Sequence, residues 1–427
     1  MLRAIVPVVA EHGYFHTKIA DIAEQAGISR ATFYELFPSK EQCLLAAHRR
    51  LADEFHVQHE AALDGASAGG EIEASLELLV KLAREEPAVF ELLTHDVTLA
   101  GPAGGAERER LLAQLVATVA DRLRGKRVAA EGAPELPLRL LIGGAVRLIG
   151  MRLRSASAQL PALAELVEWT SLYAGAGAGT RWREFDSDGE FARETLEHDP
   201  VEPFIPQAPP RGRHGLPAAV VRRVQRDRVL HATAAAMAQK GYAETTVADI
   251  VATAGLSREV FYAHLHSRRE ALEEATKVFF EQTFARMAGA FFTAPASWPD
   301  RVWAAGLALT RFLVAAPSFT RLVLIESYAP DADAARRADE LLLAFAMFVR
   351  VGFEESEPEG AAAIPAIVPE AVVSVVIEAI SAFVQQQRIE ELPGLVPLGT
   401  YLTLAPFAGG ASATALVDAK IAELRAS

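Results

Sequence analysis

Apolar residues recur three and four positions apart along most of this chain, which is the period of an α-helix with one buried face. Alanine and leucine are abundant, whereas the alternation of β-branched and polar residues that marks a strand is scarce. The pattern predicts helices over residues 41–63, 71–84, 87–99, 107–124, 138–154, 162–173, 369–387 and 395–406. The sequence therefore predicts an all-α protein.

Two stretches carry the same shorter pattern. Residues 17–40 read TKIADIAEQAGISRATFYELFPSK, and residues 245–268 read TTVADIVATAGLSREVFYAHLHSR, at a constant offset of 228. Each stretch predicts a short helix, a glycine that ends it in the left-handed conformation, and a second short helix. The expected N-caps are Thr17, Ser29, Thr245 and Ser257. This succession is a helix-turn-helix, whose second helix is shaped to enter the major groove of DNA.

Matching residues recur in register between 13–39 and 241–267: Gly-Tyr, Thr, Ala-Asp-Ile, Ala-Gly, Ser-Arg, Phe-Tyr and Ser. This pattern resembles the DNA-binding domain of TetR-type (tetracycline-repressor-like) transcriptional regulators. The resemblance implies helical repressors that bind DNA as homodimers, each subunit having a larger C-terminal domain that binds an effector and dimerises. The chain resembles two such subunits fused head to tail.

The duplication covers whole subunits, because Pro317 matches Pro87 at an offset of 230. We expect DNA-binding domains over 1–45 and 218–275 and helical effector and dimerisation domains over 46–176 and 276–427. A linker is expected over 177–217. It has an acidic stretch with a candidate short helix at 191–196, and even as coil it would span tens of ångströms.

The helices over 138–154 and 162–173 in the first copy, and over 369–387 and 395–406 in the second, are candidates for the four-helix arrangement by which the family dimerises. Pairing within one chain makes an internal pseudo-dimer and raises the effective concentration of one recognition helix beside the other. An effector would relieve repression by favouring a body conformation that spreads the two DNA-binding domains.

The first helix is expected over residues 1–12, ending at Gly13, and Pro7 should kink it or delay its start. Its counterpart in the second copy has a basic approach, with Arg222, Arg223, Arg226 and Arg228, that maps before residue 1. Either the first copy lost this arm or the start of the chain is cut short. The sequence leaves both alternatives open.

Charge is unevenly placed along the chain, whose formal net charge is −13. Residues 211–277 hold eleven basic and seven acidic residues, so the excess of acid lies elsewhere, as fits a protein that touches DNA at one end. Cys43 is the single cysteine, which excludes a disulfide framework and favours a reducing cytoplasm. No apolar run is expected to approach the roughly 18 residues of a membrane helix, and the start is too short for a signal peptide.

The DNA-binding candidates are Thr17, Ser29, Arg30, Ala31, Thr32, Tyr34, Lys40, Arg211, Arg213, Thr245, Ser257, Arg258, Glu259, Tyr262, His264 and Arg268. The start of each first helix offers free amides to phosphate. By resemblance, the tyrosines, Lys40 and Arg268 contact the DNA backbone. Arg can pair with guanine, Thr can meet the thymine methyl and Glu can accept from cytosine, so Arg30 with Thr32, and Arg258 with Glu259, could read bases. Both arginines are equally compatible with phosphate contacts.

The recognition helices differ in sequence. Ala31-Thr32 aligns with Glu259-Val260, and Leu36-Phe37 aligns with His264-Leu265. A homodimer reads a palindrome because its halves are identical, so unlike helices predict an imperfect or asymmetric operator of double-stranded DNA. In the linker, Arg211 and Arg213 flank a glycine, as in segments that lie along narrow minor grooves. A flexible cationic joint is the plainer interpretation.

The expectation of a small-molecule effector rests on the resemblance alone, and the sequence does not identify the molecule. His95-Asp96 and Glu326-Tyr328 hold corresponding positions, and Arg147, Arg152 and Arg154 line one helix, but such residues are more typical of structural polar contacts. Trp169 and Tyr401 are interpreted as core or interface aromatics.

No histidine or cysteine has zinc-ligand spacing, and no nucleophile with a base or phosphate loop is present, so neither a metal, a cofactor nor an enzyme is predicted. Cys43 is interpreted as a core residue, because its counterpart is Ala271. One alternative remains, a ligand-sequestering or protein-interaction bundle in which one or both DNA-binding copies are degenerate.

Overall fold

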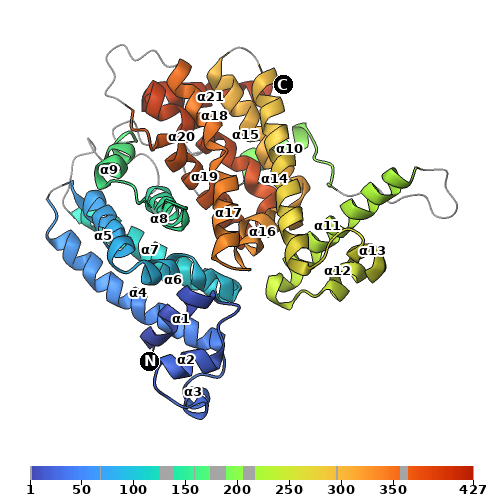
Figure 1. Cartoon of the computed structure of the whole chain (residues 1–427). Helices are drawn as coiled ribbons and strands as arrows, with labels where there is room; N and C mark the ends of the chain where they lie inside the picture. The colour runs from blue at the N-terminus through green and yellow to red at the C-terminus, as the bar shows by residue number, and fades with distance from the viewer. Residues whose placement is uncertain are drawn as a thin grey trace.

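The computed structural model describes residues 2–67, 69–125, 138–157, 159–173, 189–204, 217–294, 297–355 and 364–426. Within these residues every regular element is a helix and no strand occurs, which confirms the all-α prediction (Figure 1).

The first copy begins with a small DNA-binding unit and continues as a helical body. Its elements are η1 (Leu2–Ala4), α1 (Ile5–His12), α2 (Ile19–Gln25), α3 (Arg30–Leu36), α4 (Lys40–Asp64), α5 (Glu71–Glu85), α6 (Pro87–Thr94), η2 (Asp96–Ala100), α7 (Pro102–Gly125), α8 (Leu138–Arg154) and α9 (Leu163–Ser171). The long helix α4 leads out of the DNA-binding unit into the body, as the sequence predicted.

The second copy repeats this order. Its elements are α11 (Ala218–Glu244), α12 (Val247–Ala254), α13 (Arg258–Tyr262), α14 (Arg268–Thr293), α15 (Trp298–Ala315), α16 (Pro317–Leu324), η4 (Glu326–Tyr328), α17 (Ala332–Leu343), α18 (Ala346–Glu355), α19 (Val368–Gln385), η5 (Ile389–Leu395), α20 (Val396–Ala408) and α21 (Gly410–Ala426). Two differences matter below: the single helix α7 corresponds to the broken pair α17 and α18, and α11 is much longer than α1.

Pro7 delays the first α-helix rather than kinking it. Residues Leu2–Ala4 form a 3-10 turn, and α1 begins only at Ile5, so Pro7 lies in its first turn, where its missing N–H breaks no helical hydrogen bond. Gly13 ends the helix with φ of 74°, in agreement with its predicted role.

The threonines Thr17 and Thr245 do not cap their helices, so this prediction was wrong. The N-caps are the next residues, Lys18 and Thr246. Both threonine side chains are buried and donate backwards, to the carbonyls of Gly13 at 2.8 Å and Gly241 at 2.7 Å. They close the loop before the helix-turn-helix, a role that a hydroxyl can fill without reaching solvent.

The linker is not a free tether where the structure describes it. The predicted short helix forms as α10 (Glu190–His198) and packs on η5 of the second body. Phe191 meets Trp303 edge to face with ring centroids 5.8 Å apart, and Glu194 accepts from Arg425 at 2.9 Å. Residues 189–204 therefore belong to the surface of the second body.

The two copies meet chiefly where α8 lies against α19, near the centre of the molecule (Figure 1). The backbones approach closely there, because a Cβ added at Gly144 would lie 3.2 Å from Val375 Cα. Tyr173, which follows α9, contacts α20 through its hydroxyl, which donates to the Leu402 carbonyl at 2.9 Å. The predicted internal pseudo-dimer forms, although α8 and α19 carry most of it.

One helix, α19, is long and apolar enough to cross a membrane by composition, contrary to the expectation from the sequence. Of that span, 83% is buried inside the protein, and Glu378 lies in it, paired with arginines from the first copy. These two facts identify α19 as a core helix of the pseudo-dimer, the usual alternative explanation for such a signal.

Candidate nucleic-acid interface and effector cavity

The two recognition helices α3 and α13 present the predicted residues to solvent. Tyr34 is 52% exposed and Tyr262 is 51% exposed, values that are high for aromatic side chains in a folded protein. Arg30, Ala31, Arg258 and Glu259 are exposed as well, while Thr32 is partly buried. Behind them Phe33 and Phe261 are fully buried, as predicted, and attach each helix to its domain.

The caps of the recognition helices are as predicted. The Ser29 hydroxyl accepts from the Thr32 amide at 3.0 Å, and the Ser257 hydroxyl accepts from the Val260 amide at 3.3 Å. His264 lies after the end of α13 rather than on it, so the prediction that it belongs to the recognition helix was wrong. Burial, with Arg226 and Arg222 nearby, lowers the pKa of His264.

Lys40 and Arg268 occupy equivalent positions and make equivalent contacts. Lys40 Nζ donates to the carbonyls of Tyr14 at 2.6 Å and Thr17 at 3.0 Å and lies 4.5 Å from the centre of the Tyr14 ring. Arg268 donates to the Thr245 carbonyl at 2.8 Å and lies over the Tyr242 ring at 4.3 Å. These cations hold the loop that precedes the helix-turn-helix, and their predicted contact with DNA phosphates remains a prediction. Arg211 and Arg213 lie outside the described residues.

The loops of the two DNA-binding units touch. Phe15 of the first copy meets Tyr242 of the second edge to face, with ring centroids 6.4 Å apart. The amide of Tyr242 in turn donates to the carboxylate of Glu326 in η4 at 2.7 Å. Burial raises the pKa of Glu326. This carboxylate therefore connects the second body to its DNA-binding unit.

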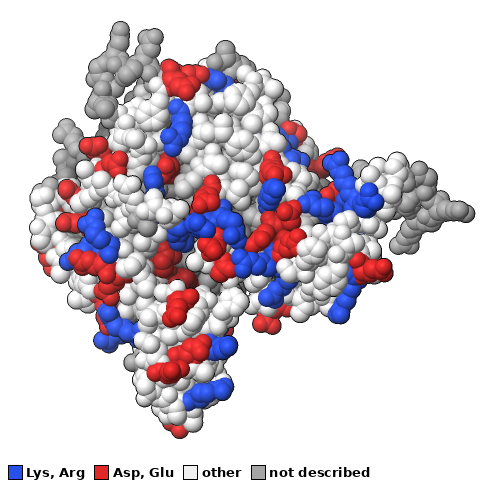
Figure 2. All heavy atoms as spheres, viewed as in Figure 1, with Lys and Arg blue, Asp and Glu red and all other residues white. Residues whose placement is uncertain are grey.

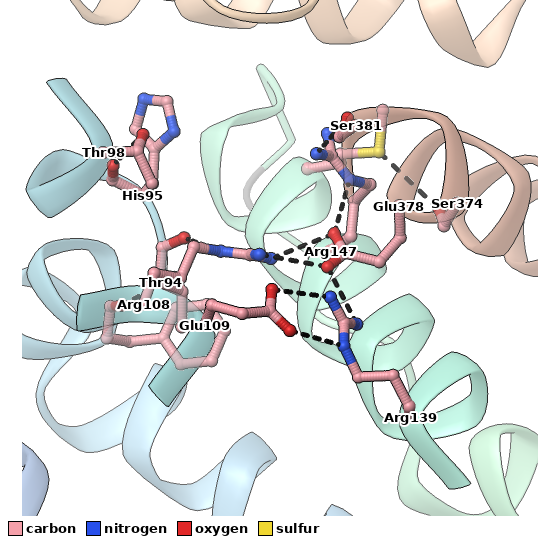
Figure 3. A network of polar contacts seen from close by, with 12 residues as sticks. Thr94, His95, Thr98, Arg108, Glu109, Arg139, Arg147, Ser374, Glu378 and Ser381 are labelled. Atoms are coloured by element: carbon pink, nitrogen blue, oxygen red, sulfur yellow. Dashed lines mark hydrogen bonds and ion pairs between the residues drawn. The ribbon is translucent and has the colours of Figure 1, made fainter. Parts of the chain in front are cut away.

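A buried ionic network joins the two bodies (Figure 3). Glu378 of α19 is 1% exposed and accepts two hydrogen bonds from Arg108, each of 3.0 Å. Arg139 at 3.1 Å and Arg147 at 3.2 Å complete its surroundings. Burial opposes the charged form, but the three guanidinium groups outweigh it and hold the pKa of Glu378 well below its usual range.

The arginines of α8 that the sequence placed on one face all reach across to the second copy. Arg152 pairs with Glu370 at 2.7 Å, and Arg154 pairs with Asp339 at 2.7 Å. Asp339 also accepts from the Tyr328 hydroxyl at 2.8 Å. Among the described residues, every ion pair between the bodies joins an arginine of the first copy to a carboxylate of the second. The prediction that these arginines are structural is confirmed.

The second body encloses a cavity of about 160 Å³ between α14, α15, α16, α18, α19 and α20. Its wall includes Phe280, Leu309 and Phe345 and contains no charged side chain. Of its five threonines, four donate to backbone carbonyls, whereas the buried hydroxyl of Thr400 has no partner. This cavity suits an apolar molecule with little polar chemistry.

The first body holds a space of only about 20 Å³ at the comparable place. Phe55, Leu79, Leu115 and Val146 converge there. The unbroken helix α7 packs along α4, whereas its counterpart is interrupted between α17 and α18. No group of histidine, cysteine or acidic side chains that could hold a metal occurs in the part of the chain that the structure describes.

The model of the bacterial regulatory proteins of the tetR family matches this chain twice, at residues 1–47 and 229–285, which contain the two helix-turn-helix units. The chain carries two TetR-type DNA-binding domains in tandem. Both matches agree with the resemblance of the sequence repeat.

Proteins similar to this chain include the fatty acid metabolism regulator protein of Bacillus subtilis (strain 168), which is 30% identical over 100 residues. The aligned part is 23% of this chain and 47% of that protein, so the chain spans about half the length of this curated relative. The solved structure of the fatty acid degradation regulator FadR from Bacillus halodurans aligns with 42% of this chain and 97% of its own, with 14% identity and a TM-score of 0.37.

Three parts of the TetR-type arrangement were not predicted: the cavity in one body, the contact of Glu326 with Tyr242, and the carboxylate partners of the arginines. The arginine spacing on α8 was a usable signal, because such a row on an apolar helix requires acidic partners. The cavity left no such signal, since apolar walls and apolar cores have the same composition.

Proposed function

We propose that one chain acts as a complete operator-binding unit, a fused dimer that reads two unlike half-sites of double-stranded DNA. The observation that carries this proposal is the pair of exposed, unlike recognition helices on bodies joined by a buried ionic network. Arg30 and Thr32 would read one half-site and Arg258 and Glu259 the other.

The regulator would respond to an apolar effector held in the second body. The cavity between α14 and α20 supports this, because its wall is mostly apolar and the space at the comparable place in the first body is only about 20 Å³. The name of the Bacillus subtilis relative, a fatty acid metabolism regulator, favours a hydrocarbon-chain molecule. Most simply the protein is a repressor that its effector releases from DNA.

Light scattering on the chain with a duplex recovered from random-sequence selection tests the fused dimer. We expect one chain on one duplex, and a selected site with two unlike halves. Arg30→Ala should lower affinity by about tenfold or more through one half-site only, and Arg258→Ala through the other. Two chains on a perfect palindrome, or no enriched sequence, would contradict the proposal and favour a ligand-sequestering bundle.

Gly399→Leu tests the effector site. Gly399 lines the cavity and a Cβ there meets nothing within 4 Å, so leucine should fill the space without a clash. Binding of the apolar fluorophore N-phenyl-1-naphthylamine should be lost. The matched control is Gly289→Leu, at an exposed position of α14 that is equally open. Equal fluorophore binding by both variants would place the effector elsewhere.

A further inference from the structure

We propose that the linker segment 199–204, which we call the strap, transmits the state of the cavity in the second body to the second DNA-binding unit. The proposal rests on the effector cavity of the preceding section. It adds a route that a pair of separate subunits would lack, because the strap exists only where two copies are joined in one chain.

The strap is fixed to α15 at both ends. Asp199 forms an ion pair with Arg311, whose guanidinium also donates to the Asp199 carbonyl at 2.9 Å. At the other end, the Phe204 amide donates to the Ala315 carbonyl at 2.8 Å. Because Ala315 is the last residue of α15, this carbonyl has no helical partner to satisfy and is free to accept from the strap.

The ring of Phe204 is inserted between the body and the DNA-binding unit. Its centroid lies 5.4 Å from that of Phe312 in α15 and 5.9 Å from that of Phe319 in α16. On the other side it lies 4.7 Å from His231 in α11, the helix that continues into the second DNA-binding unit. Burial lowers the pKa of His231 to about 4, so the imidazole is neutral at physiological pH and packs as an aromatic ring.

One layer of aromatic residues separates the strap from the cavity. Phe279, which lines the cavity, stacks on Phe312 at 5.1 Å and on Phe319 at 5.4 Å. A ligand that displaces Phe279 must therefore move the two rings against which Phe204 packs. Since packed aromatic layers shift between discrete arrangements, such a displacement would change the position of α11 against the second body.

The first copy holds its DNA-binding unit differently. The residue that matches His231 at the offset of 228 is Arg3, which pairs with Glu54 at 2.8 Å and Glu86 at 3.2 Å. Arg3 is 58% exposed, and neither of its partners lines the small space in the first body. The strap therefore makes one DNA-binding unit, and not the other, sensitive to the cavity.

Distance measurement between spin labels tests the strap without relying on DNA binding. Labels at Glu35→Cys and Ala263→Cys, both exposed and next to the recognition residues, report the separation of the two units in a Cys43→Ala background. We expect Phe204→Ala to broaden the distance distribution at least about twofold. The matched control is Phe191→Ala, which removes another linker ring, one that packs against Trp303 of α15, and it should leave the distribution unchanged.

Saturating N-phenyl-1-naphthylamine should shift the distance in the parent and in Phe191→Ala but not in Phe204→Ala. An unchanged distribution in Phe204→Ala, or no shift in the parent once the fluorophore is bound, would overturn the strap. If the fluorophore does not bind the parent, the proposal of an effector cavity is contradicted. The broadening by Phe204→Ala then decides whether the strap still holds the second DNA-binding unit. Absence of a selected operator would count against the proposed function and leave the distance result intact.

Discussion

The first and second bodies descend from one repeated pattern, yet one is filled and the other is hollow. The difference lies in how the helix after the 3-10 turn is built. Where α7 runs unbroken, Leu115 and Phe55 close the centre of the body. Where α17 and α18 divide the same part of the chain, a cavity of about 160 Å³ remains. On the face drawn in Figure 2, basic and acidic side chains lie intermixed, both in the middle of the view and over the rest of the surface.

This comparison teaches that duplication has separated two tasks that a symmetric dimer performs twice. The first body supplies the arginines of the contact between copies and holds a space of only about 20 Å³ where the second body has its cavity. The second body supplies the carboxylates and the space. Two properties can be tested by substitution: the dependence of the contact between the bodies on buried carboxylates, and the presence of the cavity in the second body.

Glu378→Gln should have the largest effect, because it leaves three guanidinium groups without their buried counter-charge. Removing one partner of a buried ion pair costs about 3–5 kcal/mol, which urea unfolding would measure. Glu109→Gln is the control, since Glu109 also pairs with Arg139 but is 37% exposed. Its cost should stay below about 1 kcal/mol. Equal costs would show that the network does not hold the copies together.

The same carboxylate predicts acid sensitivity. The folded-state pKa of Glu378 lies below its ordinary value of 4.5, so its contribution to stability is complete above that value. The contribution is lost as the pH falls from there through the folded-state pKa. Below about pH 4.5, the Tm of the parent should therefore fall more steeply with decreasing pH than the Tm of Glu378→Gln. Parallel pH profiles would contradict the assignment.

Leu115→Ala should open the first body. Leu115 is 3% exposed, and truncating such a core leucine costs about 2–5 kcal/mol. Leu313→Ala truncates a leucine of similar burial that already faces the cavity of the second body, so it should cost less. If both cost the same in urea unfolding, the second body is not hollow in solution.

Asp96 and Glu326 occupy matching positions in the two bodies, and only Glu326 is shown accepting from a DNA-binding unit. Burial and the neighbouring Glu91 carboxylate raise the pKa of Asp96 to about 7, with Arg154 opposing. A raised pKa means that the folded state loses stability as the pH rises from about 4 to 7. Asp96→Asn should remove this loss and raise the Tm by about 2 °C at pH 8. No gain at pH 8 would show that Asp96 is ionised without penalty.

Cys43→Ala should have the smallest effect. Cys43 is fully buried, and its counterpart Ala271 is fully buried too, so alanine already serves at this place in the fold. The cost in urea unfolding should stay below about 1 kcal/mol. A larger cost would show that the two DNA-binding units pack differently at this position.

The sequence predicted most of the fold because helical period, glycine stops and serine caps act locally. Ser29, Ser257, Gly13 and the helix over 138–154 could be placed without knowing their neighbours. The helix predicted over 87–99 instead ends at Thr94, and the helix predicted over 107–124 already begins at Pro102. Thr17 and Thr245 were misassigned because a threonine before a helix can cap it or can donate backwards, and only the buried loop decides between the two.

What the sequence did not show depends on contacts between distant segments. Phe204 stands in a stretch of linker composition, and its position against His231 requires the fold of the second body. Likewise, Glu378 is one acid in an apolar helix until α8 brings three arginines to it. Burial of such groups is decided by pairing, which local patterns do not record.

In the part of the chain that the structure describes, the ion pairs between the two bodies all join an arginine of the first copy to a carboxylate of the second. This asymmetry determines which bodies can pair with each other. If two first bodies paired, arginines would face arginines. If two second bodies paired, carboxylates would face carboxylates. Both combinations leave buried like charges, which cost several kcal/mol. Pairing of two like bodies is therefore disfavoured, whereas the first body of one chain stays complementary in charge to the second body of another.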